Sequence, residues 1–422
     1  MELIDMVLDN RNLNKAYKQV YANKGASGVD GITVEELKSY LFHHKEEIKE
    51  QILNRKYKPS PVRRVEIPKE NGKMRLLGIP TVVDRVIQQA LAQVLSPIFE
   101  TQFSDASFGF RPNRSCEMAV IRSLEIMNDG YDYIVDIDLE RFFDTVNQDK
   151  LIGIIRKTIK DGEVVSLITK FLQSGVMVNG IFEETKTGTP QGGNLSPLLS
   201  NIMLNELDKE LEARGLNFTR YADDTLIYVK SEKAAIRVME SITSFIEKKL
   251  GLKVNASKSK ISRPKEIKYL GFGFYKDKNG NYKPRPHQKS VQKLKQKLKQ
   301  LLKRSWSISL DVRLKKLKQL ILGWVNYFKI ADMKTLLRDI DAHIRRKLRV
   351  VIWKQWKSGK TRFESLLKLG IRSQDARKNA WSSKSYWRMS ANPIMHIALS
   401  NARLTKRGLA SLLTQYQKVH VK

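Results

Sequence analysis

The stretch from Asn217 to Lys230, NFTRYADDTLIYVK, carries two adjacent aspartates between two apolar runs. Apolar runs on both sides of a short polar break are typical of a strand, a turn and a second strand. Asp223 and Asp224 are therefore expected at the tip of a hairpin. An isolated pair of aspartates most often forms an exposed turn, but adjacent carboxylates also repel each other unless a cation is present.

A second acidic stretch, DIDLERFFD from Asp136 to Asp144, favours the cation. It continues a run of strand-forming residues, and the two-residue period of a strand places Asp136 and Asp138 on one face. A buried carboxylate there needs a partner. Two Mg²⁺ ions about 4 Å apart, held by Asp138 and Asp223, would provide one and would suit an in-line phosphoryl transfer. Asp136 and Asp144 have a simpler alternative, which is to orient neighbours or cap the next helix.

Charge is distributed unevenly along the 422 residues. The chain has 77 Lys and Arg against 44 Asp and Glu, a net charge of +33, and 41% of its residues are hydrophobic. Residues 1–280 carry a net charge of +4 and residues 281–422 carry +29. This composition excludes a wholly disordered chain and predicts two or three domains, of which the strongly basic C-terminal third favours a polyanionic partner.

Cysteine and histidine usage excludes other classes. The lone Cys116 cannot form an intramolecular disulfide, and the six scattered histidines lack zinc-finger spacing. The acidic N-terminal segment and the absence of a long apolar run predict neither a signal peptide nor a membrane span. We therefore expect a cytoplasmic protein with no membrane partner.

Hydrophobic periodicity predicts the elements of the first part. Residues 1–60 read as helices around a glycine-containing loop. A basic hairpin is expected over residues 62–77, because strand-forming residues flank an Asn71-Gly72 turn. A helix is expected from Asp84 to Phe99, with the region of Ser96 and Pro97 ending it.

The rest of the chain reads as two regions. Strands and helices interleave over residues 130–275, which predicts a mixed α/β domain. Pro284 and Pro286 are expected to mark a break. Basic amphipathic helices should follow over residues 291–302, 311–330 and 335–357, and most of the six tryptophans there are expected in the core.

Three motifs carry a resemblance to a known family. They are DIDLERFFD, GTPQGGNLSP from Gly188 to Pro197, and YADD on the predicted hairpin. In this combination they strongly resemble the reverse transcriptases. Further motifs resemble the maturase-type reverse transcriptases encoded by bacterial group II introns, and with them the match covers essentially the whole chain. These are IPKENGKMRLLGIPTVVDRVIQQAL (67–91), SFGFRPNRS (107–115), LKVNASKSK (252–260), KYLGFGF (268–274) and GWVNYF (323–328).

The resemblance implies a fold and a division into domains. The fold would be a right-hand polymerase of the α+β class, with fingers and a ferredoxin-like palm, followed by an α-helical basic thumb and a small DNA-binding region. The implied domains are an N-terminal extension with the start of the fingers (1–60), fingers and palm (61–283), the thumb or maturase X domain (284–360) and a basic C-terminal region (361–422). Many relatives also carry a metal-binding endonuclease with cysteine pairs; none is seen here, so second-strand cleavage is not expected.

The resemblance also implies the catalytic residues. Asp138, Asp223 and Asp224 would be catalytic and, with the backbone carbonyl of Leu139, would bind two Mg²⁺ ions, for which Mn²⁺ could substitute. Phe143 would stack under the deoxyribose and exclude a 2′-hydroxyl, with a core phenylalanine as the alternative. The full set implied to bind the incoming deoxynucleoside triphosphate is Lys69, Arg75, Phe143, Gln191 and Lys258.

Nucleic-acid contacts are implied in two further groups. The template and primer would be bound by Arg63, Arg64, Arg111, Arg114, Tyr269, Leu270 and Gly271. The thumb would bind RNA through Arg345, Arg346, Lys347, Arg349, Lys354 and Lys357. Solvated surface charge explains Arg63 and Arg64 about as well, and the same thumb charges would suit a template-primer duplex or intron RNA.

The implied function is an RNA-directed DNA polymerase of a group II intron, which also binds intron RNA to assist splicing and supports retrohoming. Its partners would be intron RNA, an RNA template with a DNA or RNA primer, target DNA, deoxynucleotides and a second copy of the chain as a homodimer. The expected location is bacterial, cytoplasmic and nucleoid-associated. Two alternatives remain open: a domesticated reverse transcriptase acting in DNA repair or defence, and a splicing RNA chaperone without polymerase activity.

Overall fold

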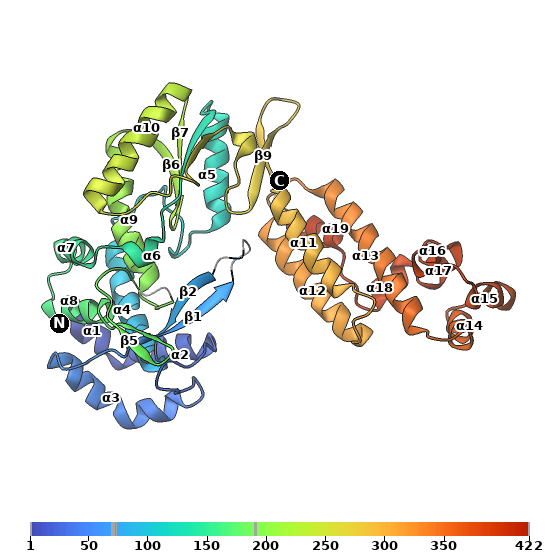
Figure 1. Cartoon of the computed structure of the whole chain (residues 1–422), viewed down its shortest axis with the longest axis horizontal. Helices are drawn as coiled ribbons and strands as arrows, with labels where there is room; N and C mark the ends of the chain where they lie inside the picture. The colour runs from blue at the N-terminus through green and yellow to red at the C-terminus, as the bar shows by residue number, and fades with distance from the viewer. Residues whose placement is uncertain (1, 69–71, 73, 190–191, 421–422) are drawn as a thin grey trace. The chain divides into compact units, whose positions relative to one another are not determined.

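The computed structural model describes residues 2–68, 72, 74–189 and 192–420. The chain divides into two compact units, Met1–Arg263 and Pro264–Lys422 (Figure 1). This division falls before the predicted functional boundary at residue 283, and the functional limits stay a prediction.

The first unit mixes helices and strands. Its elements are α1 (Leu3–Leu8), α2 (Asn10–Ala22), α3 (Leu37–Leu53), β1 (Val62–Pro68), β2 (Met74–Ile79), α4 (Val82–Glu100), α5 (Cys116–Asn128), β3 (Tyr133–Ile137), α6 (Phe142–Thr145), α7 (Gln148–Thr158), α8 (Gly162–Leu172), β4 (Val176–Val178), β5 (Ile181–Glu183), α9 (Ser196–Ala213), β6 (Asn217–Tyr221), β7 (Asp224–Val229), α10 (Glu232–Phe245), the π-helix η1 (Ile246–Leu250) and β8 (Lys260–Ser262).

The second unit is mainly helical. Its elements are the 3₁₀ turn η2 (Pro264–Glu266), β9 (Phe272–Lys276), β10 (Tyr282–Pro286), α11 (Gln288–Leu301), α12 (Leu310–Tyr327), α13 (Lys334–Gln355), α14 (Gly359–Lys368), α15 (Ser373–Ala380), α16 (Tyr386–Met389), α17 (Pro393–Ala398), α18 (Asn401–Lys406) and α19 (Leu412–Val419). No helix among the described residues is both long and apolar enough to cross a membrane.

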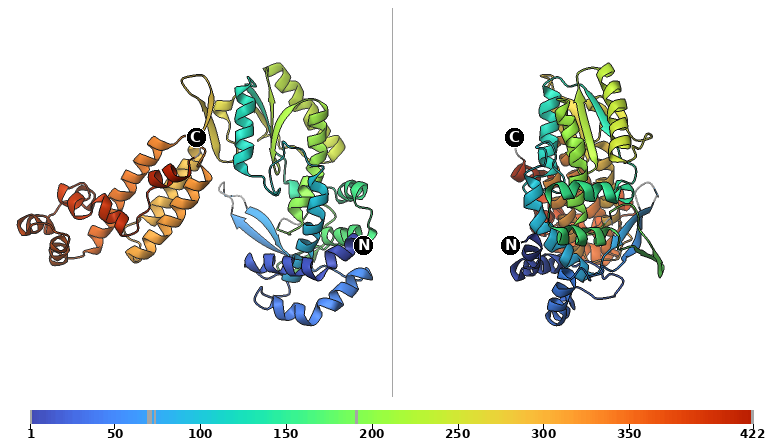
Figure 2. Two further views of the ribbon diagram at one scale, coloured as in Figure 1. Left: turned by 180° about the vertical axis from the view of Figure 1, so that it is seen from behind. Right: turned by 90° about the vertical axis from the view of Figure 1, so that its left-hand side faces the viewer.

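One antiparallel sheet of the first unit has the strand order β6-β7-β3-β8. Along the chain, helices connect β3 to the β6–β7 hairpin and α10 connects that hairpin to β8, which gives a β-α-β-β-α-β pattern. The helices α5 and α10 pack against this sheet (Figure 2). The central pair β3–β7 brings the end of β3 beside the start of β7.

A second sheet contains the predicted basic hairpin. Its strand order is β2-β1-β4-β5, and β1 pairs with β2 in a register from Arg63 opposite Ile79 to Pro68 opposite Met74. The hairpin prediction is therefore confirmed for the described residues, whereas most of its turn lies outside them.

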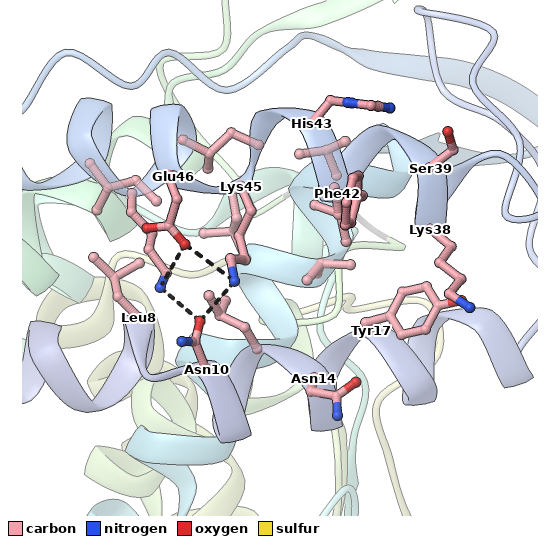
Figure 3. Close-up of a pocket in the computed structure, with 18 of the residues that line it drawn as sticks. Leu8, Asn10, Asn14, Tyr17, Lys38, Ser39, Phe42, His43, Lys45 and Glu46 are labelled. Atoms are coloured by element: carbon pink, nitrogen blue, oxygen red, sulfur yellow. Dashed lines mark hydrogen bonds and ion pairs between the residues drawn. The ribbon is translucent and has the colours of Figure 1, made fainter.

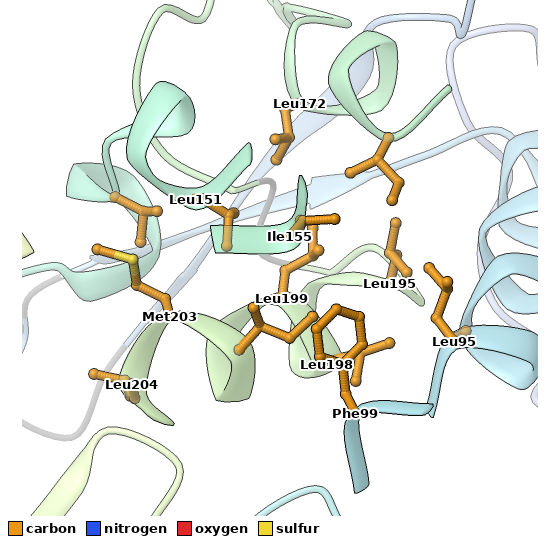
Figure 4. Packing of buried hydrophobic residues seen from close by; sticks show 14 of the residues in the cluster. Leu95, Phe99, Leu151, Ile155, Leu172, Leu195, Leu198, Leu199, Met203 and Leu204 are labelled. Carbon is orange, nitrogen blue, oxygen red and sulfur yellow. The ribbon is translucent and has the colours of Figure 1, made fainter. Parts of the chain in front are cut away.

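The core of the first unit lies where α4, α7 and α9 meet (Figure 4). The buried side chains there are mostly leucines, and large-to-small changes in such a core cost about 2–5 kcal/mol each. The labelled members include Leu95, Phe99, Leu151, Ile155, Leu198, Leu199 and Met203, which are at most 8% exposed.

The sequence predicts the helix α4 to within two residues at its start and one residue at its end. The helix α4 continues through Pro97 to Glu100, because Leu95 and Phe99 keep the buried stripe on both sides of the proline. Pro284 and Pro286 lie in the strand β10 and not in an irregular segment between two domains. Proline is tolerated there because β10 is an edge strand of a two-stranded sheet.

The prediction that most tryptophans are in the core is wrong. All six lie in the described part of the chain, where Trp353 is buried, Trp381 and Trp387 are exposed and the others are intermediate. Exposed indole rings on a basic helical unit are available for contacts outside the chain.

Candidate active site

The YADD motif forms the tip of the β6–β7 hairpin, as the sequence predicts. Tyr221 pairs with Asp224, so Ala222 and Asp223 are the two turn residues. Ala222 has a φ of +57°, a left-handed conformation that costs an alanine about 1–2 kcal/mol. Because Ile137 lies opposite Thr225 in the β3–β7 pair, the register brings Asp138 next to Asp224.

A buried arginine, Arg220, joins this turn to the helix α9 by hydrogen bonds. The side chains of Arg220 and Asp208 are both 0% exposed, and Arg220 donates through Nε and Nη2 to the two Asp208 oxygens at 2.7 and 2.5 Å. Its Nη1 donates to the carbonyl of Ala222 at 2.9 Å and to Oδ1 of Asn201 at 3.0 Å. The strained turn is therefore tied to two residues of α9.

The SFGFRPNRS segment supports the same turn from a second side. The Phe108 N–H donates to the carbonyl of Arg220 at 2.8 Å, and the Asn201 amide donates to the carbonyl of Gly109 at 2.8 Å. A Cβ at Gly109 would overlap the backbone nitrogen of Ala222 and would lie 3.0 Å from the carbonyl carbon of Tyr221. Only a glycine lets the two segments approach this closely.

Two carboxyl groups at the site, Asp136 and Asp224, have a raised pKa. The Asp224 residue is exposed at the surface, but neighbouring protein atoms surround its carboxyl group. This burial is the largest cause that raises the pKa of Asp224 to about 6, and the charges of Asp223, Asp136 and Asp138 add to the rise. Burial also raises the pKa of Asp136 to about 6, and Asp138 adds to this rise while Lys260 opposes it. The site therefore holds more negative charge than the protein neutralises.

One lysine pairs with the central carboxylate. Lys258 Nζ lies 3.0 and 3.1 Å from the two oxygens of Asp138, and the Asp138 N–H donates to Ser259 Oγ at 3.0 Å. Leu139 is buried beside Val254, where the Asn255 N–H donates to the Asp138 carbonyl at 2.8 Å. LKVNASKSK thus holds the end of β3 in place.

The donor set fits a hard divalent cation in its chemistry. Neighbouring carboxylate oxygens with uncompensated charge are the ligands that Mg²⁺ and Mn²⁺ prefer. Among the described residues, however, no three potential ligands converge closely enough to form a ready-made metal site. Lys258 contacts both Asp138 oxygens, so it would compete with a cation for that carboxylate.

Phe143 lies beside a cavity that several predicted motifs share. The cavity of about 290 Å³ is lined by Phe143, by Arg64 of β1 and by Gly188 and Thr189. The Thr189 N–H donates to the carbonyl of Phe143 at 2.6 Å, and a Cβ at Gly188 would lie 2.7 Å from the same oxygen. The structure thus brings the predicted sugar-contacting residue, the GTPQGG loop and the basic hairpin together.

The other predicted nucleotide-binding residues are placed less completely. Arg75 lies exposed on β2, opposite Ile67. Lys69 and Gln191 lie outside the described residues.

The predicted template residues differ in how free their side chains are. Arg63 donates to the carbonyl of Ser27 at 2.7 Å, and Arg114 forms an ion pair with Asp105 at 2.5 Å. Arg111 requires a correction, because its side chain is 3% exposed, pairs with Glu100 and donates to carbonyls of the neighbouring loop. It stabilises that loop and has no face left for a template.

The KYLGFGF and GWVNYF motifs contact each other within the second unit. Tyr269 is buried, and Leu270 and Gly271 have φ angles of +48° and +84°. The Tyr327 hydroxyl donates to the carbonyl of Leu270 at 2.9 Å, and the ring of Phe328 lies 4.9 Å from that of Phe272. These two motifs form one packed turn.

The predicted RNA-binding residues lie mostly on one helix. Arg345, Arg346 and Lys347 are partly exposed on α13, as Lys354 is at its end, and Lys357 follows it fully exposed. Arg349 requires a correction, because it is 4% exposed and donates to the Leu399 carbonyl at 3.0 Å and to the Asn401 side chain at 3.1 Å. It joins α13 to the start of α18 instead of facing solvent.

A cavity of about 980 Å³ lies elsewhere in the first unit, between α2, α3 and α4 (Figure 3). Lys45 and Lys49 both donate to the side chain of Asn10 at its edge, and Phe42 is 84% exposed. None of the catalytic carboxylates lines it. This cavity is larger than the one beside Phe143, but it lies away from the candidate catalytic carboxylates.

Sequence reasoning missed the residues that hold the YADD turn. Gly109 lies in SFGFRPNRS, and Arg220 directly precedes YADD. The glycine between two aromatic residues is a usable signal for close backbone approach. Nothing in the sequence links Asp208 or Asn201 to the turn.

Comparison with known proteins identifies the class. Residues 67–274 match the family described as reverse transcriptase (RNA-dependent DNA polymerase), which defines the chain as a reverse transcriptase. Residues 291–370 match the group II intron maturase-specific domain. The chain therefore belongs to the reverse transcriptases of the group II intron type, RNA-directed DNA polymerases with a maturase domain.

Several curated proteins are similar to this chain. Protein YkfC of Escherichia coli K12 is 33% identical over 299 residues, which cover 61% of this chain and 78% of that protein. The group II intron-encoded protein LtrA of Lactococcus lactis subsp. cremoris is 40% identical over 219 residues, which cover 50% of this chain and 35% of LtrA. The putative COX1/OXI3 intron 2 protein of Saccharomyces cerevisiae is 30% identical over 332 residues, 64% of this chain and 38% of that protein.

Proposed function

We propose that this chain copies RNA into DNA at the Asp138, Asp223 and Asp224 cluster, and that its second unit binds intron RNA to assist splicing. The observation that carries the proposal is the β3–β7 register, which sets Asp138 beside Asp224 at the YADD turn. Family membership supports the choice of polymerisation over other phosphoryl transfers.

Each carboxylate has a role in this proposal. Asp138 and Asp223, with Asp224 and the Leu139 carbonyl, would hold two divalent cations, taken to be Mg²⁺. When bound, such cations neutralise a triphosphate and favour deprotonation of the primer 3′-hydroxyl. Lys258, which pairs with Asp138 in this structure, would protonate the departing pyrophosphate.

The nucleotide would lie between the basic hairpin and the end of α6. Arg75 and Lys69 supply positive charge for the triphosphate, and Gln191 would contact the nucleotide. The ring of Phe143 would block a 2′-hydroxyl, which makes the product DNA. The proximity of Phe143 to the GTPQGG loop supports this arrangement.

The domain roles follow from the same proposal. Residues 1–60 would extend the fingers, 61–283 would form fingers and palm, 284–360 the thumb and 361–422 a DNA-binding region. Arg64, Leu270 and Gly271 would contact template or primer, whereas the buried Tyr269 would hold their turn in place. The remaining partners would be target DNA and a second copy of the chain.

Primer extension on an RNA template tests the proposal. Wild-type protein with Mg²⁺ should extend a DNA primer with deoxynucleotides, and Asp223→Asn should abolish this, since removal of a metal ligand removes charge neutralisation. Asp129→Asn, a change of an exposed aspartate at the end of α5, is the matched control. No extension by the wild type together with tight RNA binding would instead indicate a splicing chaperone.

A further inference from the structure

A groove with basic sides lies within the second unit, between α11 and α13, and Trp387 of α16 forms one end. Its volume is about 810 Å³. The floor is apolar, because Leu298, Leu302 and Ile340 are at most 4% exposed. A groove of this size and lining can take part of a polymer that offers flat apolar faces.

Positive charge surrounds that floor. Lys295 and Lys299 line the α11 side, and Lys347 lines the α13 side. Asp339 is the single acidic residue among its described lining residues. After burial, the charges of Lys347, Lys295 and Arg346 lower the pKa of His343, which lies in the groove, so these cations act on one point.

Trp387 offers an indole ring at the end of the groove. The ring is 40% exposed, and the guanidinium carbon of Arg346 lies 3.7 Å from its centroid. Lys347 Nζ lies 4.9 Å from the same centroid. An aromatic ring that its neighbours hold in place beside cations is the usual platform on which a nucleic-acid base stacks.

We infer that this groove binds an unpaired stretch of RNA, with a base stacked on Trp387 and the following phosphates at Lys295 and Lys299. The inference rests on the proposed function, since it names the form of RNA that the second unit takes. Unpaired bases expose the flat faces that suit an apolar floor and an indole, whereas a duplex presents stacked bases and a continuous phosphate surface. The excess of cations favours a polyanion over an acidic peptide of lower charge density.

Binding of a fluorescein-labelled ten-nucleotide oligouridylate by the full-length chain tests the base contact. Trp387→Ala should weaken binding about tenfold, the order of effect expected when one stacking platform is lost. Trp381→Ala is the matched control, because Trp381 is 61% exposed but lies against Phe363, outside the groove. This control should bind within about twofold of the wild type, a change well below the loss of one stacked base.

The salt dependence of binding tests the phosphate contacts. Lys295→Ala with Lys299→Ala should reduce the slope of log affinity against log salt by about 1.4, since each single-strand phosphate contact contributes about 0.7. The control is Lys289→Ala with Lys297→Ala, which removes the same charge from α11 outside the groove lining. Its slope should change by less than half as much, because these lysines lack a fixed phosphate contact.

Primer extension on an RNA template with a DNA primer separates the two proposals. If Trp387→Ala still extends the primer but no longer binds the oligouridylate, the result supports the groove. If the wild type binds the oligouridylate but does not extend the primer, the result refutes only the polymerase proposal. Three results would overturn the groove assignment. Trp387→Ala could bind the oligouridylate with wild-type affinity, or it could lose as much affinity for an RNA–DNA hybrid duplex as for the oligouridylate. A ten-residue polyglutamate at equal concentration could also displace the oligouridylate.

Discussion

Replacing Arg220 with methionine should destabilise the protein and disable its active-site turn. The change leaves the Asp208 carboxylate, whose side chain is 0% exposed, without its counter-ion. Breaking a buried ion pair by removing one partner costs about 3–5 kcal/mol. The variant also loses the bond from Arg220 to the Ala222 carbonyl, which holds a turn residue at a φ of +57°.

The pH dependence of this variant is a second signature of the same cause. Burial raises the pKa of Asp208, and Arg220 is the group that opposes the rise. Without Arg220 the pKa of Asp208 is raised further above its value in the unfolded chain. The carboxyl then favours folding only while it is protonated, so the stability of Arg220→Met should fall as the pH rises above the usual range of an aspartate.

Urea unfolding and primer extension together provide the assay. Arg220→Met should lose about 3–5 kcal/mol, whereas Arg220→Met with Asp208→Leu should recover most of that loss, because no buried charge is left unpaired. Activity of the double variant should stay low, since the Ala222 carbonyl still lacks its donor. Arg214→Met removes a half-exposed ion pair with Glu210 and should cost at most about 1 kcal/mol. A single variant with wild-type stability, or a double variant with wild-type turnover, would refute this reasoning.

Three further changes test other parts of the structure. Gly109→Ala should lower the turnover number at least tenfold with little change in nucleotide KM, because its Cβ displaces the Ala222 backbone; equal turnover in steady-state extension would contradict this close approach. Phe143→Ala should admit ribonucleotides into the product, and unchanged discrimination between the two sugars in competition assays would exclude the steric gate. Arg349→Ala should lower the unfolding free energy by about 1–3 kcal/mol, because the Leu399 carbonyl and Asn401 lose a buried donor. Its affinity for the oligouridylate should stay the same. A selective loss of RNA binding at unchanged stability would argue that Arg349 faces RNA.

Local chemistry explains what could be predicted from the sequence. The β6–β7 and β1–β2 hairpins follow from turn residues between strand-forming runs that are adjacent in the chain. The aspartates of the candidate site stand out because DIDLERFFD and YADD occur together with GTPQGGNLSP, and this combination resembles the reverse transcriptases. An isolated pair of aspartates would most often form an exposed turn.

What could not be predicted depends on partners distant in the sequence. Arg220 and Asp208 are twelve residues apart, on a strand and a helix, and no local pattern shows that they pair in the core. Arg349 looks like a surface charge because the Leu399 carbonyl that it binds is 50 residues away in the sequence. Arg111 binds carbonyls only four and seven residues before it, but no local pattern shows that this loop folds around its side chain. The strand β10 was missed because proline signals a break unless the sheet edge is known.

The packed turn of KYLGFGF and GWVNYF bears on how this protein can be divided for expression. The match to the reverse transcriptase family stops at residue 274, inside β9, whereas β9 pairs with β10 and its aromatic residues pack on α12. A fragment cut at residue 274 would expose Phe272 and Phe274, both fully buried in the whole chain, beside an unpaired strand edge. Such a fragment should aggregate, while a cut near Arg263 would leave the turn whole within the second unit.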